Sequence, residues 1–291
     1  RRQRQMCIRD RWVTEAFKMK KECQLPAKVS VHPNQNDFIT TMPCLLPTHY
    51  QTFGVKVVSR VNGRHPALRS NLMLYDSRNG ELKAIIDANW ITSMRTGAVA
   101  TLAIKTFRKS NAETYSFIGL GETAHATMRC LLSEFSNEHL YVRLFRYKKQ
   151  AEQFKNDFAA YSNVTFEIVD TIEDLVTDTD VLVSCITDAQ DLLIKDTSIL
   201  KSGILLVPVH TRGFQNCDTI FDKVFADDTE HVRGFKFFDK FKSYGELGDV
   251  LQGIQVGRET DEERILSYNI GLGLHDLYYA YHIYNQLKAY R

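Results

Sequence analysis

Residues 116–124 read Ser-Phe-Ile-Gly-Leu-Gly-Glu-Thr-Ala, and this stretch decides the fold. A short apolar run leads directly into a glycine-rich turn, and the apolar side chains after the turn recur with the period of a helix. In such a strand-turn-helix, Gly119 makes the tight turn, Gly121 lets a pyrophosphate approach the backbone, and Ala124 packs helix against strand. Free backbone N–H groups at the helix start favour an anion. The predicted dinucleotide contacts in this stretch are Gly119, Gly121, Glu122, Thr123 and Ala124.

A second strand is expected over residues 140–145, and the residues after it bear on the type of dinucleotide. An acid at this position would select NAD by holding the ribose 2′-hydroxyl. The sequence has no acid there, and Arg146, Lys148 and Lys149 follow the strand instead. Because cations can neutralise a 2′-phosphate, we expect NADP(H) to be preferred to NAD(H), with Arg146 and Lys148 as contacts. The alternative is an exposed basic turn that binds no ligand.

Strand and helix patterns alternate from about residue 106 to residue 225. Strands are expected at Phe117, Val142, Phe166, 181–186, 204–209 and 224–226. This alternation predicts an α/β fold, a doubly wound parallel sheet of the Rossmann type with helices on both faces. Ligands bind beyond the carboxyl ends of such strands, so Cys185, Thr187 and Val209 are expected to face the cofactor.

The flanking regions have a different pattern. Residues 10–24 are typical of an amphipathic helix, and strands are expected over residues 54–60, 71–75 and 81–87, the last two joined by an Asn79-Gly80 turn. A helix is expected over residues 90–108. The final part, residues 262–287, is also predicted to be a helix, whose tyrosines pack against protein rather than bind a ligand.

Composition excludes several classes of function. The chain has 291 residues, 44% of them hydrophobic and 25% charged, and its net charge of +2 gives no reason to expect a nucleic-acid partner. No zinc-ligand spacing is present, so no metal site is expected. The six cysteines are far apart in sequence, and no apolar run reaches the length of a membrane span. These features favour a cytoplasmic protein with reduced thiols and no membrane partner.

Several motifs together resemble the ornithine cyclodeaminase and mu-crystallin family. The most specific is residues 91–100, Ile-Thr-Ser-Met-Arg-Thr-Gly-Ala-Val-Ala, and Gly-Val-Lys-Val-Val at residues 54–58 is the next. Downstream, Glu-Leu-Gly at 246–248, Tyr-Asn-Ile-Gly at 268–271 and Asp276 extend the similarity. The resemblance covers the chain from about residue 28 onward.

The resemblance implies a discontinuous architecture and a homodimer. Residues 1–106 and 256–291 would form an α+β substrate-binding and dimerisation domain, and residues 107–255 the dinucleotide-binding Rossmann domain. By position, Lys56 matches the active-site lysine, Arg95 the arginine that binds the substrate carboxylate, and Thr96 a residue at the cofactor phosphate. Asn269 matches a position near the nicotinamide. Lys28 stands where many relatives have a second substrate-binding arginine.

Each of these residues also has a structural explanation. Lys56 in a strand can also be explained as an edge-strand charge that prevents aggregation. Arg95 at the start of an apolar helix is explained by pairing with an acid such as Asp87. Thr96 is explained as a structural cap.

One departure from the family pattern affects the expected reaction. Cyclodeaminases of this family carry an Asp after the strand that corresponds to residues 204–209, and this chain has His210-Thr211-Arg212 there. A histidine can transfer protons, and Arg212 can bind a further carboxylate or phosphate. The alternative is that His210 and Arg212 order a surface loop.

Three functions remain open from the sequence. The first is an NAD(P)-dependent oxidoreductase that acts on the C–N bond of a small 2-amino or 2-imino acid, as an imine reductase or amino-acid dehydrogenase does, with Lys56, Arg95 and His210 at the reacting groups. The second is a cyclodeaminase that recycles its bound cofactor. The third is a cofactor-loaded binding protein similar to mu-crystallin. The basic residues after the second strand favour the first, and the missing Asp weakens the second.

Overall fold

The chain folds as two compact units in the computed structural model, which describes residues 2–186, 189 and 191–289, with side chains from residue 11 onward. Unit 1 comprises Arg1–Asp10 and Thr96–Ile270, and unit 2 comprises Arg11–Arg95 and Gly271–Arg291. Unit 2 is therefore discontinuous in sequence. Helices α1 (Arg2–Met19) and α2 (Asn89–Phe107) each contribute residues to both units. The domain boundaries expected from the sequence, at 106/107 and 255/256, stay a prediction.

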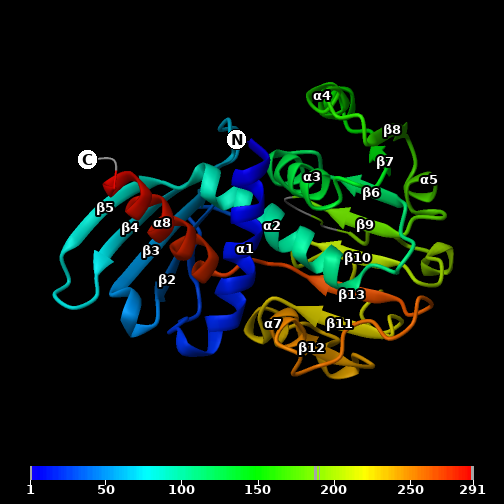
Figure 1. Cartoon of the computed structure of the whole chain (residues 1–291). Coiled ribbons are helices and arrows are strands. Elements are labelled where there is room, and N and C mark those ends of the chain that lie inside the picture. The colour runs from blue at the N-terminus through cyan, green and yellow to red at the C-terminus, as the bar shows by residue number, and fades with distance from the viewer. Residues whose placement is uncertain (1, 187–188, 190, 290–291) are drawn as a thin grey trace. The chain divides into compact units, whose positions relative to one another are not determined.

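Unit 1 is built on an eight-stranded sheet in which all paired neighbours run parallel (Figure 1). Its order is β12-β11-β13-β10-β9-β6-β7-β8. Counted along the sheet from its β8 edge, the first six strands are β8-β7-β6-β9-β10-β13. This is the Rossmann order, and it confirms the predicted fold class. The strands are β6 (Thr114–Ile118), β7 (Leu140–Phe145), β8 (Val164–Val169), β9 (Val181–Ser184), β10 (Leu205–Pro208), β11 (Lys223–Ala226), β12 (Tyr244–Glu246) and β13 (Ile265–Tyr268).

The helices of unit 1 connect these strands as crossovers. They are α3 (Glu122–Glu134), α4 (Gln150–Asp157), α5 (Ile172–Val176), α6 (Thr229–Val232) and α7 (Leu247–Leu251), with short 3-10 turns η3 (Thr197–Ile199) and η4 (Phe238–Lys240). The central strands β9 and β10 are buried at every position, as expected of a parallel strand covered on both faces.

The prediction of one helix over residues 262–287 is wrong for its first part. Residues 265–268 form β13, which pairs with both β10 and β11, and α8 (Gly273–Lys288) begins only after Gly271. A short, fully buried strand is a continuous apolar run, and such a run cannot be distinguished from a buried helix by its periodicity. Gly271 has a φ of +104°, a conformation that separates the strand from the helix.

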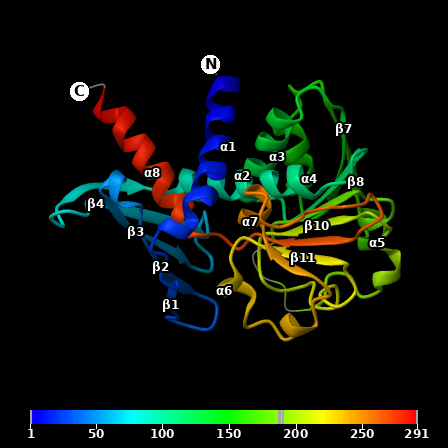
Figure 2. The ribbon, with the colours of Figure 1, turned by 60° about the horizontal axis from the view of Figure 1, so that its bottom comes forward.

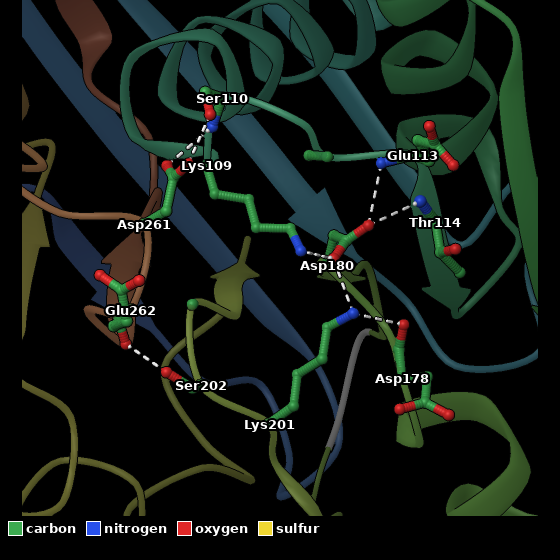
Figure 3. Close-up of polar contacts among 12 residues, drawn as sticks. Lys109, Ser110, Glu113, Thr114, Asp178, Asp180, Lys201, Ser202, Asp261 and Glu262 are labelled. Carbon is green, nitrogen blue, oxygen red and sulfur yellow. Dashed lines mark hydrogen bonds and ion pairs between the residues drawn. The ribbon is translucent and has the colours of Figure 1, made fainter.

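A network of polar side chains fixes the amino-terminal edge of the unit 1 sheet (Figure 3). The buried carboxylate of Asp180, just before β9, accepts hydrogen bonds from the backbone N–H groups of Glu113 and Thr114 at 2.9 and 3.0 Å. Lys109 and Lys201 both point toward it, with Nζ 2.8 and 2.7 Å from Oδ1. The start of β6 and the start of β9 are thus held by one side chain.

Unit 2 is an antiparallel five-stranded sheet in the order β1-β2-β3-β4-β5, with α8 packed across β2, β3 and β4 (Figure 2). The strands are β1 (Val29–Val31), β2 (Phe38–Leu45), β3 (Thr52–Arg60), β4 (Leu68–Asp76) and β5 (Leu82–Asp87), with 3-10 turns η1 (Lys20–Glu22) and η2 (Thr48–Tyr50). The expected Asn79-Gly80 turn joins β4 to β5, and Asp76 N–H donates to the carbonyl of Glu81 at 2.8 Å.

The two faces of the unit 2 sheet differ in burial. Met42, Lys56 and Leu72 are paired across β2, β3 and β4 and are all buried. On the opposite face, the next register row carries the half-exposed or exposed apolar residues Pro43, Val55, Met73 and Ile85. Because successive side chains of a strand alternate between faces, one face forms the core of the unit and the other is left as an apolar surface.

Tyr278 and Tyr279 of α8 pack against other residues of unit 2, in line with the expectation that these tyrosines pack against protein. The hydroxyl of Tyr278 donates to Glu15 Oε2 at 2.9 Å and lies 3.4 Å from the hydroxyl of Tyr50. Tyr279 is buried edge-on against Trp12. Of the helices in the described part of the chain, none combines the length and apolar character of a membrane span.

Candidate functional site

The glycine-rich turn lies at the carboxyl end of β6, where the strand order reverses direction between β6 and β9. Gly119 has a φ of +82°, and a Cβ there would lie 2.5 Å from the backbone nitrogen of Ile186, so only glycine fits. A Cβ on Gly121, in contrast, would meet no atom within 4 Å. The turn therefore leaves open space at Gly121 beside the start of α3.

The first turn of α3 matches an anion site in its local structure. Within this turn, Glu122 is exposed, Thr123 is half-buried and Ala124 is fully buried. His125 lies in the same turn, and its Nδ1 is 3.0 Å from the carbonyl of Gly121 while Nε2 is 3.0 Å from Asp157 Oδ2. The backbone amides of Glu122 and Thr123 begin the helix, where unpaired N–H groups and the helix dipole favour a phosphate. A dinucleotide pyrophosphate fits this turn.

Other predicted cofactor residues lie at the same edge of the sheet. Cys185 follows β9, and its backbone N–H donates to Ile118 at 2.8 Å; burial raises the pKa of its thiol to about 12, so the thiol is neutral. Val209 follows β10 and donates its N–H to Ser184 at 3.0 Å. Asn269 follows β13, and its buried Oδ1 has no hydrogen-bond partner among the described residues. Thr187 lies outside the described residues.

His210 is brought to this edge together with a residue that the sequence analysis missed. The Nε2 atom of His210 is 2.6 Å from the hydroxyl of Ser184, the last residue of β9. Burial lowers the pKa of His210 to about 4, so its imidazole is neutral at neutral pH. Arg212, two residues further, is exposed.

The basic residues after β7 are exposed, and one is already paired with acids. Arg146 Nε is 2.6 Å from Asp170 Oδ1, and its Nη1 contacts Glu152. The Nζ of Lys148 lies 5.1 Å from the ring centroid of Tyr147. Asp170 follows β8, the strand next to β7, so an acid stands near this position although it comes from another segment of the chain.

Lys56, Arg95 and Asp276 form a group of buried, ion-paired side chains in unit 2. Lys56 Nζ lies 2.6 Å from Asp276 Oδ2, and Arg95 Nε lies 3.0 Å from Asp276 Oδ1. The side chains of Lys56, Arg95 and Asp276 are only 1%, 6% and 0% exposed. Two cations from β3 and α2 thus share one carboxylate from the first turn of α8, and we call these three residues the buried charge cluster.

Burial and charge have opposite effects on the two titrating groups of the cluster. Burial and, after it, the charge of Arg95 lower the pKa of Lys56, Asp276 opposes both, and the resulting pKa is about 7. Burial alone would raise the pKa of Asp276, but Arg95 and Lys56 outweigh it and hold that pKa below its usual value. Asp276 is therefore ionised at neutral pH, and Lys56 is close to its midpoint.

The edge-strand explanation of Lys56 does not hold, whereas Arg95 does pair with an acid, as its structural explanation expects. Lys56 lies in β3, the central strand of its sheet, and is buried, so it is not an edge-strand charge. Arg95 pairs with Asp276 and not with Asp87, whose carboxylate accepts the N–H of Asn89 at 2.9 Å. Lys28 is exposed just before β1, and its charge acts on Lys56. Thr96 is half-buried on α2, next to Arg95.

Sequence reasoning did not assign a role to Asp276, Ser184 or His125. A signal for Asp276 was present: a single acid lies within the apolar run that opens the final helix, and a buried Asp is rarely found without a partner. Ser184 and His125 gave no such signal, because their partners come from separate segments.

The chain is similar to known proteins over nearly its whole length. Residues 4–290 match the model of the "Ornithine cyclodeaminase/mu-crystallin family". The chain is 26% identical over 271 residues to the nodulation efficiency protein NfeD of Rhizobium meliloti, covering 87% of this chain and 81% of that protein. It is 27% identical over 279 residues to N-((2S)-2-amino-2-carboxyethyl)-L-glutamate dehydrogenase of Staphylococcus aureus, covering 87% and 80%.

Solved structures share the fold at lower identity. The structure of Thermococcus litoralis Delta(1)-pyrroline-2-carboxylate reductase in complex with NADH and L-proline aligns with a TM-score of 0.87 and 20% identity over 98% of this chain and 94% of that one. An archaeal alanine dehydrogenase dimer with bound NAD aligns with a TM-score of 0.83 and 22% identity over 98% and 92%.

Proposed function

The chain belongs to the ornithine cyclodeaminase/mu-crystallin family, and from this premise we propose that it is a nicotinamide-dependent oxidoreductase acting on the C–N bond of a small 2-amino or 2-imino acid. The observation that carries the proposal is the buried charge cluster. When Lys56 is protonated, two cations and one carboxylate leave one positive charge, and a buried charge is stable only when it is paired. A single substrate carboxylate supplies the missing negative charge.

Arg95 and Lys56 have separate roles in this proposal. The planar guanidinium of Arg95 binds the substrate carboxylate, a geometry that arginine satisfies better than lysine. Lys56 Nζ holds or releases a proton at the substrate nitrogen, and its pKa of about 7 makes both states accessible near neutral pH. Lys28 and Arg212 are proposed to contact more distant parts of the substrate.

Unit 1 is proposed to hold the cofactor, which when bound exchanges a hydride with the substrate α-carbon. The open turn at Gly121 and the start of α3 receive the pyrophosphate, because the unpaired N–H groups there favour an anion. The buried Oδ1 of Asn269 is available to accept a hydrogen bond from an amide. Thr96, Cys185 and Val209 are proposed as further contacts.

Preference for NADP(H) is a finer part of the same proposal. Arg146 and Lys148 supply the positive charge that a 2′-phosphate needs. Asp170 and Glu152 share the guanidinium of Arg146, so binding of the phosphate has to compete with two carboxylates. We therefore expect a modest preference for NADP(H), with NAD(H) also bound.

His210 is proposed to act as a neutral hydrogen-bonding group. With its pKa lowered to about 4 by burial, it does not carry a positive charge at neutral pH. Its Nε2 lies 2.6 Å from the hydroxyl of Ser184, and its ring also hydrogen-bonds the backbone of Arg212, so these two contacts hold the imidazole in place at this edge of the sheet. An ionised Asp, which the cyclodeaminase reaction uses after this strand, has no counterpart here.

Assembly as a homodimer is proposed through the apolar face of unit 2. This face carries Pro43, Val55, Met73 and Ile85 in one register row, and Ile85 is 68% exposed. A contiguous exposed apolar patch usually marks a protein interface. The alanine dehydrogenase of the same fold is a dimer, which supports a second copy as the partner. Unit 2 is accordingly proposed as the substrate and dimerisation domain.

The test of the function is binding of NADPH and NADH by fluorescence, followed by 2-oxo acids with ammonia, cyclic 2-imino acids and diamino acids. Steady loss of NADPH or NADH with one substrate class is the expected result. Ammonia release without net oxidation would instead identify a cyclodeaminase. Cofactor binding with neither reaction would identify a binding protein.

A further inference from the structure

Asp276 contacts both of the other residues of the buried charge cluster. It lies in the first turn of α8, and each of its carboxylate oxygens pairs with a different cation. The guanidinium of Arg95 also lies against the bare side of Gly271, where any Cβ would overlap it. Asp276 and Gly271 together fix the position of Arg95 and leave Lys56 beside it.

The burial of the cluster makes its total charge important. With Lys56 protonated the three residues carry a net charge of +1, and with Lys56 neutral they carry none. An unpaired charge is costly in a buried site, so the neutral arrangement is favoured when no ligand is bound. Once a carboxylate monoanion binds, the neutral arrangement is instead the one with Lys56 protonated.

Other residues near the cluster also affect its titrating groups. Lys28, before β1, adds positive charge and favours neutral Lys56. His275 on α8 also favours the ionised form of Asp276. Cys44 on β2 is buried, and its pKa is raised by burial, by Cys23 and by Asp276, so it stays a neutral thiol.

We propose that Asp276 is a positioning residue that makes the cluster bind one substrate carboxylate together with one proton, which is taken up on Lys56. This inference rests on the proposed function, because it assumes that Arg95 receives a carboxylate. Its consequence is that substrate binding itself loads the proton-transferring group. Lys56 becomes an ammonium when a substrate is present to receive its proton.

The inference gives the pH dependence of carboxylate affinity a definite direction. Lys56 has a pKa of about 7 in the ligand-free cluster, so above pH 7 it is mostly neutral and each binding event must bring a proton. Carboxylate affinity should then fall about tenfold per pH unit above pH 7, the slope for one linked proton. Below pH 7 the affinity should become independent of this group.

The experiment measures pyruvate binding by calorimetry with NADPH present and ammonia absent, so that no turnover occurs. Titrations at pH 8 in phosphate and in Tris, whose ionisation heats differ, give the number of protons taken up. We expect about one proton per pyruvate for the wild type and none for Asp276→Asn, in which Arg95 alone already balances the carboxylate. Asp76→Asn, which changes another ion-paired aspartate of unit 2, should retain the wild-type value.

The outcomes separate this inference from the proposed function. No proton uptake by the wild type, or undiminished uptake by Asp276→Asn, would overturn the inference while pyruvate binding remained intact. Undiminished pyruvate binding by Arg95→Ala, or no binding by the wild type, would overturn the proposed carboxylate site and this inference with it. If Asp276→Asn does not fold, Lys56→Met serves instead: proton uptake that persists without the ammonium would overturn the inference.

Discussion

At the residue scale, Asp218 is a buried carboxyl group whose ionisation should lower the stability of the fold. Its Oδ1 accepts a hydrogen bond from the hydroxyl of Tyr268 at 2.7 Å. Its buried Oδ2 has no hydrogen-bond partner among the described residues. Burial raises its pKa to about 6. A raised pKa means that the folded state binds this proton more tightly than the unfolded chain, so the stabilisation is present below about pH 4 and lost as the pH rises through 6.

Replacement of Asp218 by Asn should therefore stabilise the protein at pH 8. The amide oxygen can still accept the bond from Tyr268, while the buried negative charge is removed. At about 1.4 kcal/mol per pKa unit, the gain in free energy of unfolding is at most about 3 kcal/mol at pH 8 and vanishes near pH 4. Urea unfolding at both pH values checks this. A gain of equal size at the two pH values would show that ionisation is not the cause.

Arg146 is the residue that our proposal assigns to cofactor choice, in competition with two acids. Arg146→Asp should weaken NADPH binding by about ten- to a hundredfold, the usual value of a charge-assisted phosphate contact, and NADH binding much less. Asp170→Asn should have the opposite effect, because it releases Nε of Arg146. Fluorescence titration with both cofactors measures the ratio.

Lys155→Asp is the control for cofactor choice, since it makes the same change of charge at an exposed residue of α4. Equal losses of NADPH and NADH in Arg146→Asp would refute the assignment of Arg146 to the 2′-phosphate.

At the element scale, Asp180 joins the starts of two strands, as Figure 3 shows. Burial alone would raise its pKa, but Lys109, Lys201 and two backbone N–H groups outweigh this and lower it to about 2. Its stabilisation is therefore present above about pH 4 and lost as the pH falls toward 2. Asp180→Asn should reduce the free energy of unfolding at pH 7 by about 2–4 kcal/mol, because two lysines lose their shared partner.

The neighbouring Asp178 provides a matched control for Asp180. Its side chain is exposed, and only its backbone carbonyl is used, as the acceptor for Lys201 Nζ at 2.7 Å. Chemical denaturation of Asp178→Asn should give the wild-type midpoint. If both variants lost equal stability, the effect would not come from the carboxylate of Asp180.

The elements that the sequence predicted well are those with a strong local signal. The strand at residues 140–145 has the predicted bounds, and the glycine-rich turn fixes the β6-α3 unit. β13 was missed because four buried residues, Ile-Leu-Ser-Tyr, carry no alternation, and only pairing with β10 and β11 makes them a strand.

Only part of the candidate site could be predicted from the sequence, for a similar reason. Lys56 and Arg95 were found through family motifs. The structural alternative for Arg95 was pairing with an acid such as Asp87, and the acid that lies beside it is Asp276, 181 residues away. The acid close to Arg146 likewise comes from the next strand and not from the expected position after β7. Long-range pairings of this kind are set by tertiary packing, which local patterns do not encode.

At the scale of the whole molecule, the apolar face of unit 2 predicts the oligomeric state. Met73→Lys places a charge in the row formed by Pro43, Val55 and Ile85, where a dimer would bury it without a partner. We expect the dimer mass to fall to that of a monomer in light scattering. Tyr141→Lys, at an exposed aromatic residue of unit 1, should not change the mass. A monomeric wild type would refute the assignment of this face.

The discontinuity of unit 2 also has a consequence for synthesis on the ribosome. Asp276 is translated 181 residues after Arg95, an interval of roughly 9 to 36 s at common elongation rates. Throughout this time Lys56 and Arg95 have no shared carboxylate, and β2 to β4 lack the helix that covers them. The continuous stretch Thr96–Ile270 can fold meanwhile. Premature termination before α8 would therefore yield a nascent protein with a completed nucleotide fold and an unfinished, aggregation-prone sheet.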